Sequence, residues 1–333
     1  FDDVRVPVEN LLGEPGRGFK VAMEVLNNGR IGLAAGAIGN NKKLIEMAVE
    51  RCVDRTAFNK KIGEFGMIKE KVARMMCETY ALESMTYLTT GLIDAGVPDY
   101  SLESAICKVF GSESLWSTAN EALQIAGGIG YMCEYPYERI MRDARINLIF
   151  EGTSEILRAF VALSGLQGPG KNLKEIAHAL REPIKGFGVL TDFVVQKARK
   201  TLSPERLDKA HGALKREAVL FEESVAELAR ASERMLRKHG RDIFLMQFAQ
   251  KRLAEVAIDL YGLAAVISRT TAFIEKRGED NSAREIALAT GFRVLVEERM
   301  KMKLARMERD EDELLKSIAV RTYDDAGYPL DII

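Results

Sequence analysis

The residues best placed to do chemistry lie in one short stretch, 150–155, which reads Phe-Glu-Gly-Thr-Ser-Glu. Glu151 follows an apolar run and precedes Gly152, so its carboxylate should lie at the edge of a core. An acid in such a place is suited to accepting a proton near neutral pH. The alternative is an exposed acid before an ordinary capped helix, and these six residues alone leave both interpretations open.

The residues that follow Gly152 are typical of a helix start. Thr153 and Ser154 are good N-cap types, and apolar residues then recur at helical spacing. Free backbone N–H groups at a helix N-terminus favour an anionic ligand. A base and an anion site would therefore share one turn.

Three other polar clusters have both a plain and a functional interpretation. Residues 27–30 (Asn-Asn-Gly-Arg) interrupt a helical pattern, either as a solvated bend or to hold Arg30 over a cleft. Residues 54–58 (Asp-Arg-Thr-Ala-Phe) end that pattern, where a helix-end salt bridge is the usual explanation. Residues 124–131 place a Gln and two adjacent glycines after a helical run, as a C-cap or as open amides for a pyrophosphate or ribityl chain.

Length and composition restrict the class of protein. A chain of 333 residues suggests roughly two domains, and 47% apolar residues are enough for a large core. The net charge is -1 and charges of both signs are interspersed, which argues against nucleic acid as a partner. No apolar run approaches membrane-spanning length and no signal peptide opens the sequence, so we expect a soluble protein.

Cysteines and histidines are too scattered to form an evident metal or nucleophilic site. The four cysteines contain no CxxC pair, which fits buried free thiols in a reducing compartment better than a disulfide framework or a metal cluster. The three histidines give a catalytic triad little support. These residues are Cys52, Cys77, Cys107, Cys133, His178, His211 and His239.

The first half of the chain predicts a bundle of helices. Residues 1–18 resemble a strand end and a loop, and the sequence begins in mid-pattern without Met, as the back part of a longer protein would. Their glycines only superficially resemble a phosphate loop. Helical patterns at 19–58, 65–96, 99–126 and 138–145 have short connections, which favours an antiparallel helical bundle.

The second half repeats the helical pattern of the first without its polar motifs. Residues 167–170 (Gln-Gly-Pro-Gly) mark a boundary, after which the helices become long and charged. With Lys71 set against Arg252, Tyr80 meets Tyr261 and residues 89–90 meet 270–271, both Thr-Thr. We interpret this as a degenerate duplication whose role is packing or contact with a partner.

Residues 27–30, 54–58, 124–131 and 150–155 occur in the order and approximate spacing seen in acyl-CoA dehydrogenases, and the chain resembles that family. The appended half resembles the very-long-chain branch, whose mitochondrial relatives include proteins that act in respiratory complex I assembly. The resemblance implies an all-α fold with a short β remnant at the N-terminus. Residues 1–18 would end the central β domain, 19–167 would form the C-terminal four-helix bundle, and 171–333 would form the appended helical domain.

The resemblance also implies a role for each motif residue. Glu151 would be the general base, and the substrate side would include Asn27, Arg30 and Gly152. FAD contacts from a neighbouring subunit would come from Arg55, Phe58, Gln124, Gly127 and Gly128, and others would come from Thr153 and Glu155. Ala57 departs from the Thr or Gln of many members, and no metal is expected.

The implied activity is FAD-dependent α,β-dehydrogenation of long-chain acyl-CoA to trans-2-enoyl-CoA in fatty acid β-oxidation. Electron-transfer flavoprotein would accept the electrons, and a homodimer would share its FAD sites. The compartment would be the cytoplasm in a bacterium, or the mitochondrial matrix or inner-membrane face in a eukaryote. This stretch alone would be inactive, because most of the family's β domain is absent from it.

Two alternatives differ in class from a dehydrogenase. The first is an assembly or scaffold protein that acts through the appended helices, which would contact a partner or a membrane surface. The second is an acyl-CoA oxidase, which differs in the access of oxygen to the reduced flavin.

Overall fold

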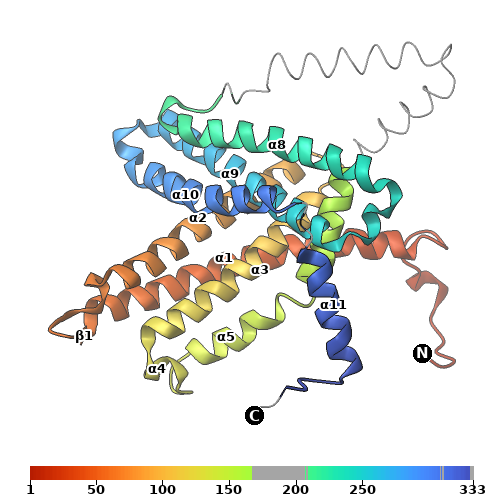
Figure 1. The fold of residues 1–333 in the computed structure, drawn as a ribbon, viewed down its shortest axis with the longest axis horizontal. Coiled ribbons are helices and arrows are strands. Elements are labelled where there is room, and N and C mark those ends of the chain that lie inside the picture. The colour runs from red at the N-terminus through yellow and green to blue at the C-terminus, as the bar shows by residue number, and fades with distance from the viewer. Residues whose placement is uncertain (167–206, 208, 308, 310, 331–333) are drawn as a thin grey trace.

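A computed structural model describes residues 1–166, 207, 209–307, 309 and 311–330. The predicted boundary at 167–170, the segment 171–206 and His178 lie outside the described residues. Two groups of helices make up the fold, and Figure 1 shows α8, α9 and α10 lying against one side of the group that contains α1, α2 and α3.

The first group is the predicted helical bundle. It contains α1 (Gly18–Asp54), α2 (Gly66–Asp94), α3 (Ser101–Ala126), the short α4 (Gly128–Tyr131), α5 (Tyr137–Ile146) and a helix at 154–166. Because the connections are short, successive long helices fold back on one another. The all-α class predicted from the sequence is confirmed.

Small residues bring α1 and α3 together. A Cβ added to Gly111 of α3 would lie 3.2 Å from Ala34 Cα in α1, so a larger side chain would separate the helices. Further along both helices, Asn41 Nδ2 donates a hydrogen bond of 3.0 Å to Ser114 Oγ. The contacts follow the same order in both helices, so α1 and α3 run in the same direction and end at the same end of the bundle.

Two local predictions are wrong. Residues 27–30 do not interrupt α1, since Arg30 is anchored to Asn27 inside a continuous helix and such packing outweighs the weak helix propensity of Asn and Gly. The described residues 1–17 contain the 3-10 turn η1 (Val8–Asn10) but no strand, because no other extended segment lies there to pair with them. The paired strands are instead β1 (Thr56–Ala57) and β2 (Lys60–Lys61), a hairpin after α1.

The second group comprises α8 (Lys215–His239), α9 (Gln247–Arg277), α10 (Ala283–Ala305) and α11 (Glu311–Asp324). The remaining short turns are η2 (Ile62–Glu64), η3 (Gly212–Leu214), η4 (Gly240–Leu245) and η5 (Asp280–Ser282). Helix α9 packs against α2, α8 and α10.

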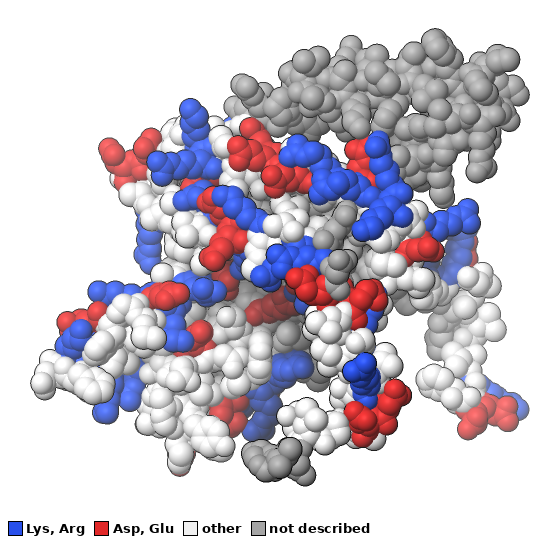
Figure 2. Space-filling view, in the orientation of Figure 1, with Lys and Arg blue, Asp and Glu red and all other residues white. Residues whose placement is uncertain are grey.

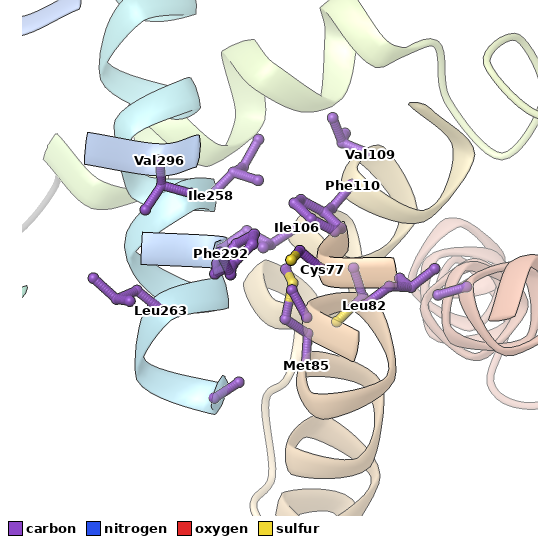
Figure 3. Packing of buried hydrophobic residues seen from close by; sticks show 14 of the residues in the cluster. Cys77, Leu82, Met85, Ile106, Val109, Phe110, Ile258, Leu263, Phe292 and Val296 are labelled. Carbon is purple, nitrogen blue, oxygen red and sulfur yellow. The ribbon is translucent and has the colours of Figure 1, made fainter. Parts of the chain in front are cut away.

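One continuous core joins the two groups. Phe292 of α10 lies edge-on to Phe110 of α3, with ring centroids 6.1 Å apart, and Figure 3 shows both rings among side chains of α2 and α9. A Cβ on Gly291 would lie only 2.6 Å from Cys77 Sγ, so the backbone of α10 closely approaches α2. Large-to-small changes at Phe292 would therefore affect both groups.

The prediction that no apolar run approaches membrane-spanning length is wrong for helix α9. Among the described residues it is the one helix long and apolar enough to cross a bilayer. However, 61% of its most apolar stretch is buried inside the molecule, because α9 lies between α2, α8 and α10. Burial against other helices accounts for its apolar character.

Charges of both signs are mixed on the surface. On the face drawn in Figure 2, Lys and Arg are interspersed with Asp and Glu.

Cys52, Cys77 and Cys107 are buried free thiols, as expected, but Cys133 is exposed. It lies in the turn between α4 and α5, where the short connection leaves no layer of side chains above it.

Candidate active site

The turn between α5 and the helix at 154–166 has an unusual backbone. Glu151 has a φ of 59° and Gly152 a φ of 94°, so two successive residues lie in the left-handed region. A non-glycine residue in this region costs about 1 to 2 kcal/mol, which surrounding contacts must offset. The Ser154 N–H closes the turn by donating to the Leu148 carbonyl at 3.1 Å. The Glu151 N–H itself donates to no other described residue.

Arg30 of α1 holds the first carbonyl of this turn. Its Nε donates to the Glu151 carbonyl at 3.1 Å, and its Nη1 donates to Asn27 Oδ1 at 3.0 Å. The side chain is buried, and burial lowers the pKa of the Arg30 guanidinium against the opposing charge of Glu151. Asn27, Arg30, Glu151 and Gly152 thus lie together, although 121 positions separate Arg30 from Glu151.

Gly29 makes room for the Glu151 carboxylate. A Cβ at Gly29 would lie 3.0 Å from both Glu151 Oε1 and Oε2. The carboxylate therefore packs directly against the backbone of α1, and Oε2 is buried without a hydrogen-bond partner among the described residues. An acid with an unpartnered oxygen retains the capacity to accept a proton.

Lys108 of α3 holds the second carbonyl, and sequence reasoning missed it. The side chain is fully buried, and its Nζ donates to the Gly152 carbonyl at 2.7 Å. Burial lowers the pKa of Lys108 to about 8, opposed chiefly by the charge of Glu113. The available signal was a lysine among apolar helical residues, Ile-Cys-Lys-Val-Phe at 106–110.

The residues after Gly152 form the expected capped helix start. Thr153 Oγ1 accepts a hydrogen bond of 3.3 Å from the Ile156 N–H, as an N-cap hydroxyl does. Glu155 is exposed in the first turn, where hydrogen bonds from its own N–H and from Thr153 lower the pKa of its carboxyl. Ser154 is buried, and its hydroxyl is without a partner among the described residues.

The other predicted cofactor residues lie at the opposite end of the bundle. Arg55 and Phe58 follow the end of α1, some 25 positions beyond Arg30, or about 36 Å along the helix. Gln124 lies in the last turn of α3, about 24 Å beyond Lys108. One flavin bound to this chain could not contact both ends.

These distant residues present exposed groups that suit a dinucleotide. Phe58 is 90% exposed, and Arg55 and Gln124 are also exposed. Gly127 and Gly128 have no atoms within 4 Å of an added Cβ, and Gly127 ends α3 with a φ of 69°. The Gly127 N–H already donates to the Leu123 and Gln124 carbonyls, so of the two glycines Gly128 alone has an open amide. A cation, an aromatic ring and an open backbone amide suit a pyrophosphate and a flavin ring.

A charged cluster joins the candidate site to the second group of helices. Arg158, on the helix that Glu151 precedes, donates to both carboxylate oxygens of Glu113 at 2.6 Å, and its Nε lies 3.2 Å from Glu255 Oε1 of α9. Arg299 of α10 bridges Asp259 and Glu78 beside it. These side chains line a cavity whose mixed charges pair with one another, so we assign the cluster to packing.

Two family models match the chain. Residues 16–166 match the model described as "Acyl-CoA dehydrogenase, C-terminal domain", and residues 212–328 match "ACAD9/ACADV, C-terminal domain". The chain belongs to the acyl-CoA dehydrogenase family. The family resemblance seen in the four motifs is therefore confirmed, and the second match bears out the resemblance of the appended half.

Relatives within the acyl-CoA dehydrogenase family match nearly the whole chain. The bovine protein named "Very long-chain specific acyl-CoA dehydrogenase, mitochondrial" is 40% identical over 316 residues, which are 93% of this chain and 48% of that protein. A "Probable acyl-CoA dehydrogenase" of Bacillus subtilis is 32% identical over 307 residues, 86% of this chain and 49% of its own. The chain thus spans about half the length of the curated relatives it matches.

A solved structure has the same fold over almost the whole chain. The acyl-CoA dehydrogenase from Bacillus anthracis, complexed with FAD, superposes with a TM-score of 0.76 at 28% identity. The match covers 98% of this chain and 56% of that one. Both groups of helices therefore occur together in another member of the acyl-CoA dehydrogenase family.

Proposed function

We propose that the protein containing this chain is an FAD-dependent acyl-CoA dehydrogenase that oxidises long-chain acyl-CoA to trans-2-enoyl-CoA in fatty acid β-oxidation. The observation that carries the proposal is the Glu151 carboxylate, held against Gly29 with a buried, unpartnered oxygen. The preference for long acyl chains rests on the 40% identity to very-long-chain relatives.

In this proposal the turn supplies both the base and a hydrogen-bond donor for the thioester carbonyl. Glu151 would accept the α-proton of the thioester, which is acidic only when the thioester carbonyl is polarised. The Glu151 N–H, which donates to no other described residue, would donate to that carbonyl oxygen. When bound, FAD would accept a hydride from the β-carbon. Arg30 and Lys108 would keep the turn in position by holding its two carbonyl groups.

The arrangement of the cofactor residues supports a homodimer. Thr153 and Glu155 lie beside Glu151, whereas Arg55, Phe58 and the glycines after Gln124 lie at the far end of the bundle. Two copies that pack with opposite ends together would combine both sets around each FAD. Arg55 would then neutralise the pyrophosphate, and Gly128 would offer a backbone amide. Gly127 would leave space for the cofactor, because no atom lies within 4 Å of an added Cβ there.

The electron acceptor and the compartment are proposed from the similarity to the acyl-CoA dehydrogenase family. Electron-transfer flavoprotein would receive the electrons, and acyl-CoA would be the substrate. The relatives at 40% identity are mitochondrial by name, which favours the matrix or the inner-membrane face for a eukaryotic protein. A bacterial member would act in the cytoplasm.

An assembly role through the appended helices is the second candidate. Helix α11 carries Leu314, Leu315, Ile318 and Val320, each more than half exposed on the chain. Apolar side chains of this kind are typical of a surface that contacts another protein or a membrane. Such a role could coexist with Glu151-dependent catalysis.

The test is Glu151→Gln in the full-length protein, with Glu46→Gln on the exposed face of α1 as the control. Reduction of FAD by a long-chain acyl-CoA is followed in the absence of an acceptor. We expect the Glu151 variant to retain FAD and to reduce it at least about 10³-fold more slowly, since general bases contribute this much. Reduction at the wild-type rate would exclude Glu151 as the base.

A substrate scan on the wild-type protein tests the remaining parts of the proposal. Acyl chains of increasing length would be compared with electron-transfer flavoprotein or oxygen as the acceptor. Turnover highest for long chains and dependent on electron-transfer flavoprotein is expected. Comparable turnover with oxygen would indicate an oxidase instead.

A further inference from the structure

Lys108 is a buried cation whose one hydrogen bond to the described residues goes to the turn that carries Glu151. None of its surface is exposed, and its neighbours in α3 include Cys107 and Val109, which are also fully buried. Its Nζ donates to the Gly152 carbonyl at 2.7 Å. An apolar side chain of similar length would pack in this place without the cost of burying an ammonium group. Packing alone therefore does not explain why a charged lysine occupies position 108.

The electrostatic surroundings of Lys108 come from three elements. Glu113 lies on its own helix α3, Arg30 lies on α1, and Glu151 and Glu155 lie on the turn and the helix that follows. Of these groups, Glu113 is already engaged by Arg158. The ammonium group is thus directed to the backbone of the turn rather than to a carboxylate.

The turn is anchored at two successive carbonyl groups by cations from different helices. Arg30 of α1 holds the Glu151 carbonyl and Lys108 of α3 holds the Gly152 carbonyl. Gly152 also packs closely against its own helix, since an added Cβ would lie 3.1 Å from Leu157 Cδ2. Without a donor at its carbonyl, Gly152 could adopt other backbone angles, and the Glu151 carboxylate would leave its place against Gly29.

We propose that Lys108 is a positioning residue, whose ammonium group fixes the Gly152 carbonyl and thereby holds the Glu151 carboxylate in its reactive place. This inference rests on the proposed role of Glu151 as the base. A misplaced base slows the chemical step while the rest of the substrate binds normally.

The experiment compares Lys108→Met and Lys108→Gln with the wild type in the full-length, FAD-loaded protein. Met keeps an unbranched apolar stem as far as Cε but lacks the terminal donor, whereas the shorter Gln side chain has an amide that can donate to a carbonyl. Lys69→Met, on the exposed face of α2, is the control for the loss of a lysine charge. Each variant is measured for kcat and KM with a long-chain acyl-CoA and for amide hydrogen exchange in residues 148–157.

We expect Lys108→Met to lower kcat about 10- to 100-fold with KM within a factor of about two, because a displacement of about 1 Å is enough for such a loss. Exchange at the turn, including the Ser154 N–H, should accelerate about tenfold or more, while exchange in the rest of α3 stays unchanged. Lys108→Gln should recover part of both properties, and Lys69→Met should match the wild type.

Two results would overturn the proposal. The first is Lys108→Met with wild-type kcat and wild-type exchange at the turn. The second is faster exchange along the whole of α3 in both variants, which would mark a purely structural residue. Because exchange needs no turnover, it still tests Lys108 if Glu151→Gln proves active, in which case the proposed function alone fails.

Discussion

A hydrogen bond of 2.9 Å joins the Tyr80 hydroxyl in α2 to Thr270 Oγ1 in α9. A second bond, of 2.8 Å, joins the Tyr261 hydroxyl in α9 to Thr89 Oγ1 in α2. In the register of the sequence repeat, Tyr80 corresponds to Tyr261 and Thr89 to Thr270, so each bond is the counterpart of the other. This reciprocity is what a duplicated helix packed antiparallel on its copy predicts.

The two tyrosines give a direct test of this pairing. Tyr80→Phe and Tyr261→Phe each remove a hydroxyl from a bond in the α2–α9 interface and should each lower the free energy of unfolding by about 1 kcal/mol. The double variant should lose about 2 kcal/mol, since the two bonds share no partner. Denaturant unfolding measures this, with the exposed Tyr328→Phe as the control. Losses that differ several-fold between the single variants would argue against equivalent bonds.

Gly29→Ala tests whether the Glu151 carboxylate needs the space that Gly29 leaves beside α1. In Gly29→Ala the new Cβ would meet both carboxylate oxygens of Glu151 at 3.0 Å, which must displace the carboxylate. We expect kcat of the full-length enzyme to fall about 10- to 100-fold. Stability should hold or rise, because Ala is favoured over Gly inside a helix by about 1 kcal/mol.

Gly36→Ala is the matched control for Gly29→Ala. Gly36 lies in the same helix, and an added Cβ there meets no atom within 4 Å. It should show the same gain in helix propensity with unchanged kcat. An equal loss of kcat in both variants would show that the carboxylate of Glu151 is not what Gly29 accommodates.

Local patterns in the sequence predicted the helices and the capped turn after Glu151 well. The contacts that position this turn were beyond reach, because Arg30 lies 121 positions and Lys108 lies 44 positions from their carbonyl acceptors. Gly29 was recognised only as part of a motif, since its role depends on which side chain packs over it. The predicted break at 27–30 failed for a related reason, because tertiary contacts of Arg30 outweigh local propensity.

The thiols should differ sharply in reactivity. Burial raises the pKa of Cys77 to about 11 and that of Cys107 to about 12, so both remain neutral thiols at pH 8, and Cys52 is also buried. Only a thiolate reacts readily, and Cys133 is exposed. Iodoacetamide at pH 8 followed by peptide mapping should label Cys133 at least about 100-fold faster than the other three. Rapid labelling of Cys107 in the native protein would contradict the packing of α3 against α2.

The buried Lys108 should also make stability depend on pH in a predictable direction. Its pKa is lowered from 10.5 to about 8 in the folded protein, so between these values the unfolded chain binds more protons than the folded one. The free energy of unfolding contributed by this group therefore rises with pH from about 8 to about 10.5, by up to about 3 kcal/mol. Raised thiol pKa values act in the opposite direction, so the wild-type curve alone is not diagnostic.

The difference between the wild type and Lys108→Met isolates this contribution. Below pH 8 the wild type bears the full cost of a buried ammonium group, and above pH 8 that cost diminishes as the group loses its proton. The stability of the wild type relative to the variant should therefore increase between pH 8 and 10, measured by denaturant unfolding at each pH. A difference that stays constant over this range would mean that Lys108 titrates near its ordinary pKa, and that its ammonium group is not desolvated at the Gly152 carbonyl.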